Sequence, residues 1–445
     1  MAERAVEQEQ PGGWRFLLRA LGHRNYRLFF AGQSVSLVGT WLTRVATAWL
    51  VYRLSGSALL LGVVGFCGQI PAFLLAPFAG VLVDRWNRHR VLVVTQVLAM
   101  LQSFVLAALA LTGVIAVWHV AVLSGVQGLI NAFDMPTRQA FVVEMVEDRA
   151  DLPNAIALNS TMFNAARLLG PSVAGGLIAW VGEGGCFLLD GFSYLAVIAS
   201  LLAMRMVRRP REHAPQHLLT ELKEGFAYAF HFGPIRALLL LLAVVSLMGM
   251  PYTVLMPVMA SEELKGGPNT LGFLMAASGL GALLGAGFLA SRRTVRGFGR
   301  VIVLTAALFG AGLVGFALSR QVVPSLLMMV VTGFGMMVAT AASNTLLQTI
   351  VEERMRGRLM SFYLMAFVGT APFGSLLAGA LAARIGAPAT IAMGGGVCLV
   401  TAAWFYVKLP KLRERTRPIY ERLGILPEVA SGMREATRRM EPAED

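Results

Sequence analysis

Long apolar runs separated by short, basic connections are the feature that most constrains the fold of this chain. A helix that crosses a bilayer needs about 20 predominantly apolar residues. Twelve segments meet this requirement, at 28–52, 58–83, 91–113, 116–142, 155–181, 186–206, 235–259, 269–290, 301–318, 323–350, 358–383 and 387–408. Because lipid offers the backbone no hydrogen-bond partners, such segments must form helices. The sequence therefore predicts an all-α membrane protein with twelve transmembrane helices.

Composition supports the same class of protein. Hydrophobic residues make up 56% of the chain and charged residues only 14%, whereas about a quarter of a soluble domain is charged. The net charge of +13 could indicate nucleic-acid binding, but the cations lie in the connections between the apolar runs. That distribution is the orientation signal of membrane proteins. We therefore expect a lipid bilayer and no nucleic acid as the partner of this chain, and we expect a monomer.

Arginine is concentrated in every second connection. The connection after the second run carries Arg85, Arg88 and Arg90, whereas the connection after the first carries only Arg53. Cytoplasmic loops hold the excess of Lys and Arg, so both termini are predicted to be cytoplasmic, as an even number of spans requires. The N-terminus lacks the apolar segment of a cleaved signal peptide. The predicted location is the cytoplasmic (inner) membrane of the cell, as a multi-pass protein.

The chain also repeats itself. The pattern Gly80-x-x-x-Asp84-Arg85 returns as Gly287-x-x-x-Ser291-Arg292, and GPSVAG at 170–175 returns as GSLLAG at 374–379. Each pair is separated by about six predicted helices, which indicates a duplicated six-helix unit. The predicted parts are a cytoplasmic N-terminal segment (1–27), a first six-helix bundle (28–207), a cytoplasmic linker with an amphipathic helix (208–233), a second six-helix bundle (234–408) and a flexible cytoplasmic tail (409–445).

A charged motif joins the second and third runs. It consists of Gly80, Asp84, Arg85, Arg88 and Arg90. Glycine lets a helix approach its neighbour closely, and the carboxylate can hold an arginine or cap a helix N-terminus. Such a cluster can act as a conformational latch that locks the cytoplasmic side in one state. The alternative is that the arginines only anchor the cytoplasmic surface.

This motif, between the second and third of twelve helices, resembles the signature of the major facilitator superfamily of secondary transporters. Asn87 stands where the family usually has Gly, and asparagine tolerates a left-handed turn better than most residues. Ser291 replaces the acid in the second copy, which should therefore contribute less. The segments WLTRVATAWLVYRLSGSALLLG, AFDMPTRQAF and LPNAIALNSTMFNAARLLGPSVAGG are similar to the branch of enterobactin exporters and macrolide-efflux-like proteins.

A second motif, in the fifth run, bears on the direction of transport. Gly170, Pro171, Ala174 and Gly175 are similar to the helix 5 motif of proton-coupled antiporters. The resemblance implies export of small molecules, such as siderophores, drugs or macrolides, by alternating access. The proton gradient would drive it, with no cofactor. Importers share this architecture, so the direction depends on the resemblance.

Polar residues recur on single faces of the first, fourth, fifth and tenth runs. In lipid, such faces must point toward protein or a water-filled cavity. In this superfamily helices 1, 4, 7 and 10 line the central path. The predicted substrate-path residues are Gln33, Thr40, Arg44, Gln127, Asn131, Asn164 and Asn344. Arg44 either contacts substrate or snorkels outward. An excess of arginine over acid would favour anionic or polar ligands.

Charges predicted to lie deep in the membrane are confined to the N-terminal half. They are Arg44, Asp134, Arg138 and Arg167. Asp134 is our candidate proton carrier, because making and breaking an ion pair with Arg167 would change its proton affinity. The alternative is a permanent structural pair, either with Arg167 or with Arg138 one helical turn along. Glu183 and Asp190 are predicted to lie nearer the outer surface.

Two other functions can be compared with transport of soluble small molecules. A lipid or lysolipid flippase has the same architecture and would need a more apolar, laterally open cavity. A membrane-embedded transferase is disfavoured, because the six histidines lie in or near connections and no pair has metal-ligand spacing within a span. The sequence also lacks a GxxxxGK[ST] phosphate loop. We therefore predict a transporter, not an enzyme, with no metal site.

Overall fold

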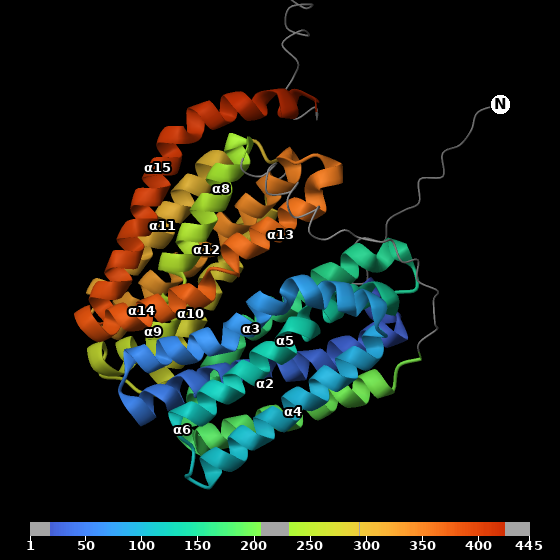
Figure 1. Ribbon diagram of the computed structural model, residues 1–445, viewed down its shortest axis with the longest axis vertical. Coiled ribbons are helices and arrows are strands. Elements are labelled where there is room, and N and C mark those ends of the chain that lie inside the picture. Colours follow the sequence, from blue (N-terminus) through green and yellow to red (C-terminus); the bar gives the residue numbers. More distant parts are fainter. Residues whose placement is uncertain (1–17, 206–230, 293, 423–445) are drawn as a thin grey trace, which may run out of the picture. The chain divides into compact units, whose positions relative to one another are not determined.

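The computed structural model describes residues 18–205, 231–292 and 294–422. Within these ranges every regular element is a helix (Figure 1). The N-terminal part contains η1 (Arg19–Gly22), α2 (Arg24–Ser55), α3 (Ala58–Arg85), α4 (Arg88–Leu111), α5 (Val117–Met145), η2 (Arg149–Asp151) and α6 (Leu152–Leu202).

The C-terminal part is more segmented. It contains α8 (Gly233–Val244), η3 (Val245–Gly249), α9 (Tyr252–Val258), η4 (Met259–Glu263), α10 (Pro268–Ala290), α11 (Phe298–Leu318), α12 (Val322–Ile350), η5 (Glu353–Met355), α13 (Arg356–Phe367), α14 (Ala371–Ile385) and α15 (Ala387–Arg422). The segments η3 and η4 are π-helical turns on either side of α9. Pro251 and Pro257 each remove a backbone donor there, which favours such departures from the α-helical pattern.

Length and hydropathy identify nine candidate membrane spans in the described part of the chain. Helices α2 and α5 are outside this set, although they contain 32 and 29 residues. Both carry the polar faces described above, which lower their mean hydropathy. The all-helical class and the membrane spans are thus confirmed. The number of twelve helices and the orientation of the termini stay predictions.

The chain divides into two compact units. The first comprises residues 1–213 and 256–276, and the second comprises 214–255 and 277–445. The boundary differs from the predicted bundles, because residues 256–276 group with the N-terminal half. Most of the predicted linker 208–233 and the residues beyond 422 lie outside the described residues. Each unit is considered by itself below.

In the first unit α2 packs between two arms of α6. On the first arm, the Tyr26 hydroxyl donates to the Ala155 carbonyl at 2.7 Å, and Gly170 contacts Trp41. On the second arm, Gly39 of α2 contacts Ser193. The first arm therefore runs parallel to α2 and the second antiparallel.

The reversal between these arms occurs at one residue. Gly182 is non-helical, with φ 72° and ψ 176°, a backbone conformation that favours glycine. It joins the predicted fifth and sixth helices without a loop. Beside it, Glu183 receives the guanidinium of Arg53 from α2, at 2.7 Å from Nε. This ion pair fixes the turn against the end of α2.

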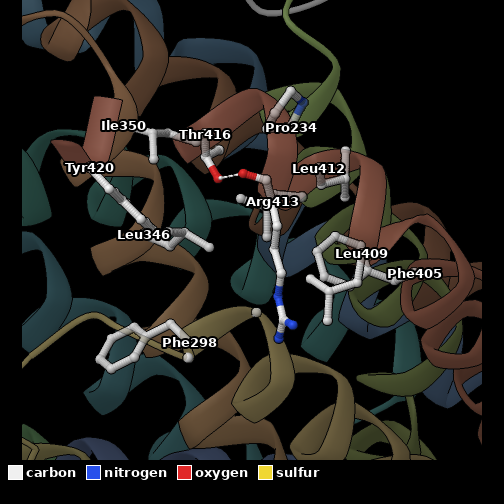
Figure 2. A pocket seen from close by; sticks show the side chains of 13 residues that line it. Pro234, Phe298, Leu346, Ile350, Phe405, Leu409, Leu412, Arg413, Thr416 and Tyr420 are labelled. Carbon is white, nitrogen blue, oxygen red and sulfur yellow. Dashed lines mark hydrogen bonds between the residues drawn. The ribbon is translucent and has the colours of Figure 1, made fainter. Parts of the chain in front are cut away.

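The second unit has an apolar core formed by α8, α11, α12 and α15. Ile235, Ile302, Leu347 and Phe405 are each 1% exposed or less. A cavity of about 60 Å³ lies beside this core, and its wall is mainly apolar (Figure 2).

The structure differs from our expectation at the C-terminal tail, because α15 continues to Arg422 instead of ending near 408. Leu409 and Thr416 are buried, which explains why the helix continues.

Candidate functional site

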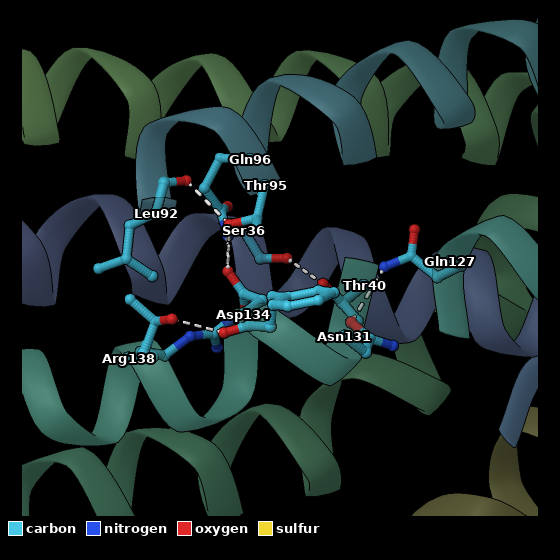
Figure 3. Close-up of polar contacts among 11 residues, drawn as sticks. Ser36, Thr40, Leu92, Thr95, Gln96, Gln127, Asn131, Asp134 and Arg138 are labelled. Atoms are coloured by element: carbon cyan, nitrogen blue, oxygen red, sulfur yellow. Dashed lines mark hydrogen bonds and ion pairs between the residues drawn. The ribbon is translucent and has the colours of Figure 1, made fainter. Parts of the chain in front are cut away.

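Asp134 is the centre of a buried polar network in the first unit. Its side chain is only 3% exposed, and its carboxylate pairs with the guanidinium of Arg138, one turn along α5. Two donors come from α4: the Thr95 hydroxyl at 2.9 Å and the Gln96 amide at 2.7 Å, both to Oδ1. Figure 3 shows these side chains converging on Asp134. Three donors, one of them charged, stabilise the ionised carboxylate.

The network follows from helix geometry on both elements. The four-residue spacing of Asp134 and Arg138 places them on one face of α5. Thr95 and Gln96 lie on the face of α4 that packs against α5, and both are buried. The second polar atom of the Gln96 amide, Oε1, has no hydrogen-bond partner among the described residues. An amide can donate or accept, so Gln96 is able to face either an ionised or a protonated Asp134.

Arg167 is not among the described ion-pair partners of Asp134. The contact present in this structure is the alternative one, with Arg138. Arg167 on α6 instead lies within electrostatic reach of Arg44 on α2. An exchange of Asp134 between the two arginines therefore stays a prediction about a second conformational state.

Arg44 and Arg167 bring two positive charges together. The Arg44 side chain is solvent-accessible although it lies in the middle of α2. Its guanidinium carbon lies 5.2 Å from the centre of the Trp41 ring, a cation–π contact. Neither arginine forms an ion pair with a described carboxylate. Because the two cations repel each other, an anion close to them would be electrostatically favoured.

The remaining predicted path residues are engaged mainly along their own helices. Gln33 is buried, and the Thr40 hydroxyl donates to the Ser36 carbonyl at 3.0 Å. The Gln127 amide donates to Asn131 at 3.2 Å, as Figure 3 shows. Both residues are half-buried. These groups line the α2 and α5 faces on which the sequence placed them.

Two further predicted path residues lie on other helices. Asn164 on α6 donates to the Ser160 carbonyl at 2.9 Å. Asn344 on α12 belongs to the second unit and accepts from the Gln348 amide at 3.0 Å. Each side chain is partly exposed. Both could exchange these local bonds for bonds to a ligand.

The helix 5 motif forms a close-packed surface. An added Cβ at Gly170 would lie 2.4 Å from the Trp41 Cβ, and one at Gly175 would lie 2.8 Å from the carbonyl of Pro268. Pro171 and Ala174 are buried between these contacts. The motif thus brings the first arm of α6 into close contact with the Trp41 side chain of α2 and with the backbone of α10. Its antiporter role stays a prediction.

The charged signature lies where α3 ends and α4 begins. The surroundings of Gly80 and the side chains of Asp84 and Arg85 lie outside the described part of the structure. Arg88 donates to Glu144 of α5 at 3.0 Å, and Arg90 is exposed. Both interpretations of this motif, a conformational latch and an anchor of the cytoplasmic surface, therefore stay predictions.

Asn87 has a different role from the one that we expected. Its φ is −73°, so it does not adopt the left-handed conformation. Instead its side-chain oxygen accepts from the backbone amide of Arg90 at 3.1 Å. This is an N-cap, which asparagine fills well because its short side chain reaches the first free amides of the helix.

Sequence reasoning missed a second buried carboxylate. Asp190 on α6 is 1% exposed; the sequence predicted that it lies nearer the outer surface than Asp134 but did not indicate that it is buried among polar partners. It accepts from Thr43 on α2 and Ser103 on α4 at 2.7 and 2.8 Å. The sequence signal for a second polar pocket was on α4. The polar pair Thr95 and Gln96 is followed seven residues later by Gln102 and Ser103, so both pairs lie on one face of the helix.

Comparison with known families gives the identity of this fold. The profile of a family described as transmembrane secretion effectors matches residues 18–427. This match covers most of the chain. The protein belongs to this family of major facilitator superfamily transporters.

The relatives compared here are a siderophore transporter and two efflux proteins. The staphyloferrin A transporter of Staphylococcus aureus is 24% identical, over 87% of this chain and 97% of its own. The multidrug efflux pump Tap of Mycolicibacterium fortuitum is 28% identical, over 84% and 93%. Macrolide efflux protein A of Streptococcus pyogenes is 23% identical, over 82% and 92%. The family and these relatives confirm a membrane transporter and not an enzyme.

Solved structures show the same fold. The peptide-transporter-family protein PepTSo has a TM-score of 0.69 at 11% identity, over 88% of this chain and 99% of its own. The nucleoside transporter NupG has a TM-score of 0.64 at 15% identity, over 87% and 98%. At these identities the likeness concerns the fold alone.

Proposed function

We propose that this transporter is a proton-coupled exporter of small molecules in the cytoplasmic membrane, working by alternating access. The single observation that carries the proposal is the buried Asp134 network. A charge at the bilayer centre costs about 3 kcal/mol on insertion scales. A carboxylate, an arginine and two polar side chains that surround it are therefore expensive to keep in a membrane bundle, and a proton carrier accounts for them.

Protonation of Asp134 would remove its charge and release Arg138. Thr95 and Gln96 would still satisfy the neutral carboxyl, because a hydroxyl accepts as well as donates and the amide can present Oε1. The released arginine is then available for another partner. Alternate protonated and ionised states of Asp134 would in this way favour different helix arrangements.

The substrate class follows from Arg44 and Arg167. Two neighbouring cations without a described carboxylate partner favour an anionic or strongly polar ligand. Trp41 beside Arg44 adds an aromatic face. A siderophore with several carboxylates or catecholates fits these groups better than an apolar drug. The direction of transport, outward, is supported by the exporting relatives.

Transport in inside-out membrane vesicles tests the proposal. Vesicles would be energised with a proton gradient and supplied with a catecholate siderophore, a macrolide or a lysolipid. We expect gradient-dependent uptake of the siderophore, lost in Asp134→Asn. Glu147→Gln is the matched control, because it also neutralises a carboxylate but at an exposed position.

The possible results separate the claims. Wild-type uptake that does not depend on the proton gradient would refute proton coupling. Uptake that stays fully coupled in Asp134→Asn would make Asp134 structural. Transport of the lysolipid alone would identify a flippase instead. Retained expression and thermal stability of the variant exclude misfolding as the cause.

A further inference from the structure

We propose that Asp190 is a second proton-binding residue of the first unit. The inference rests on the proposed proton coupling and adds a site at another depth. Asp190 lies on the second arm of α6, eight residues beyond the turn at Gly182, which is about 12 Å along the helix. Asp134 lies deeper, about 26 Å from the start of α5 at Val117.

Three helices build the pocket of Asp190. The Thr43 hydroxyl from α2 donates to Oδ2 at 2.7 Å, and the Ser103 hydroxyl from α4 donates to the same atom at 2.8 Å. Ser193, on α6 itself, lies 3.4 Å from Oδ1. Gly39 completes the wall, because an added Cβ there would lie only 2.6 Å from Oδ1. The pocket is closed, polar and shaped to the carboxyl group.

All of these partners are neutral hydroxyl groups. The cations nearest along the chain are engaged elsewhere: Arg53 with Glu183, and Arg44 with the Trp41 ring. On the helices around the pocket the other titratable or charged residues are Arg24, Tyr26, Arg27 and Tyr52 on α2, Arg88, His89 and Arg90 on α4, His119, Asp134, Arg138 and Glu144 on α5, and Arg167, Cys186 and Tyr194 on α6. Of the described residues, none of these forms an ion pair with Asp190.

Hydroxyl partners suit a group that gains and loses a proton. A hydroxyl can donate to an ionised carboxylate and accept from a protonated carboxyl, whereas an arginine can only donate. The pocket therefore satisfies both forms of Asp190. The two buried acids of this unit thus differ in kind, since Asp134 has an arginine partner that favours its ionised form.

Infrared difference spectroscopy on the full chain in proteoliposomes tests Asp190 without any substrate. The sample would be titrated with pH, and the carbonyl stretch of a protonated buried carboxyl would be followed. We expect a band that titrates in the wild type, is lost in Asp190→Asn, and is retained in Asp134→Asn. Ser103→Ala should shift the midpoint of this band to higher pH, because it removes a donor to the ionised form.

A band that is unchanged in Asp190→Asn would overturn the proposal, as would the absence of any titrating band in the wild type. If Asp190→Asn does not fold, Ser103→Ala provides the test instead. An unchanged midpoint pH of the infrared band in that variant would overturn the proposal.

The infrared titration and the transport assay separate the two proposals. Wild-type transport that does not respond to the gradient would refute the proposed function. The infrared result concerns proton binding by Asp190 alone, so its failure leaves coupling through Asp134 standing.

Discussion

At the scale of single residues, the first unit contains two buried acids with different partners. Asp134 could be predicted from the sequence because its partner Arg138 lies on the same helix at a spacing of four. The polar partners of Asp190 could not be predicted, because two of them come from α2 and α4. Contacts along one helix can be read from periodicity, whereas contacts between helices depend on how the helices pack.

The Asp134–Arg138 pair should be essential to the stability of the unit. Replacing Arg138 by Gln leaves a buried carboxylate without its cation, which should cost about 3–5 kcal/mol of unfolding free energy. Asp134→Asn combined with Arg138→Gln should recover most of that loss, because the double variant buries no charge. Unfolding of the purified variants in mixed micelles measures both values. Additive losses would show that the two side chains do not interact.

At the scale of elements, α6 determines the architecture of the first unit. The sequence predicted two helices here and the small surface of the helix 5 motif, but not its partner Trp41, which only the packing reveals. The extension of α15 was missed because its last turns are charged, and charge alone predicted a flexible tail. Their apolar face instead contacts the core of the second unit.

The motif glycines allow a matched comparison on α6. Gly170→Ala places a methyl group against Trp41, and overpacking of this kind costs about 1–3 kcal/mol. Gly176 lies six residues along the same helix, with nothing near its added Cβ. Gly176→Ala should therefore leave the thermal midpoint unchanged or raise it slightly. Equal midpoints for the two variants would contradict close packing at Gly170.

At the scale of the whole molecule, the sequence predicted the all-helical membrane class and the transporter family. The repeat and the arginine distribution also predicted a topology. In the described residues length and hydropathy give nine spans instead of twelve, because α2 and α5 carry polar groups that proteins tolerate in a bundle interior and because α6 counts as one span where two helices were predicted. Periodic polar faces therefore identify these two helices better than mean hydropathy does.

Cysteine labelling would test the predicted topology. In a chain whose native Cys67, Cys186 and Cys398 are replaced, Thr112→Cys and Gln321→Cys should react with an impermeant maleimide on intact cells. Glu147→Cys and Arg356→Cys should react only after the membrane is opened. All four positions are solvent-exposed, so a failure to label reflects the side of the membrane. The reverse pattern would place the termini outside.

The turn at Gly182 has a mechanical consequence. The helix 5 motif and Asp190 lie on opposite arms of one hairpin, and a single residue joins these arms instead of a slack loop. Arg53 ties the turn to α2. Because no loop separates the arms, we expect a tilt of the first arm to move the second arm with it. Inserting flexible residues after Gly182 should uncouple the two arms while each keeps its own packing.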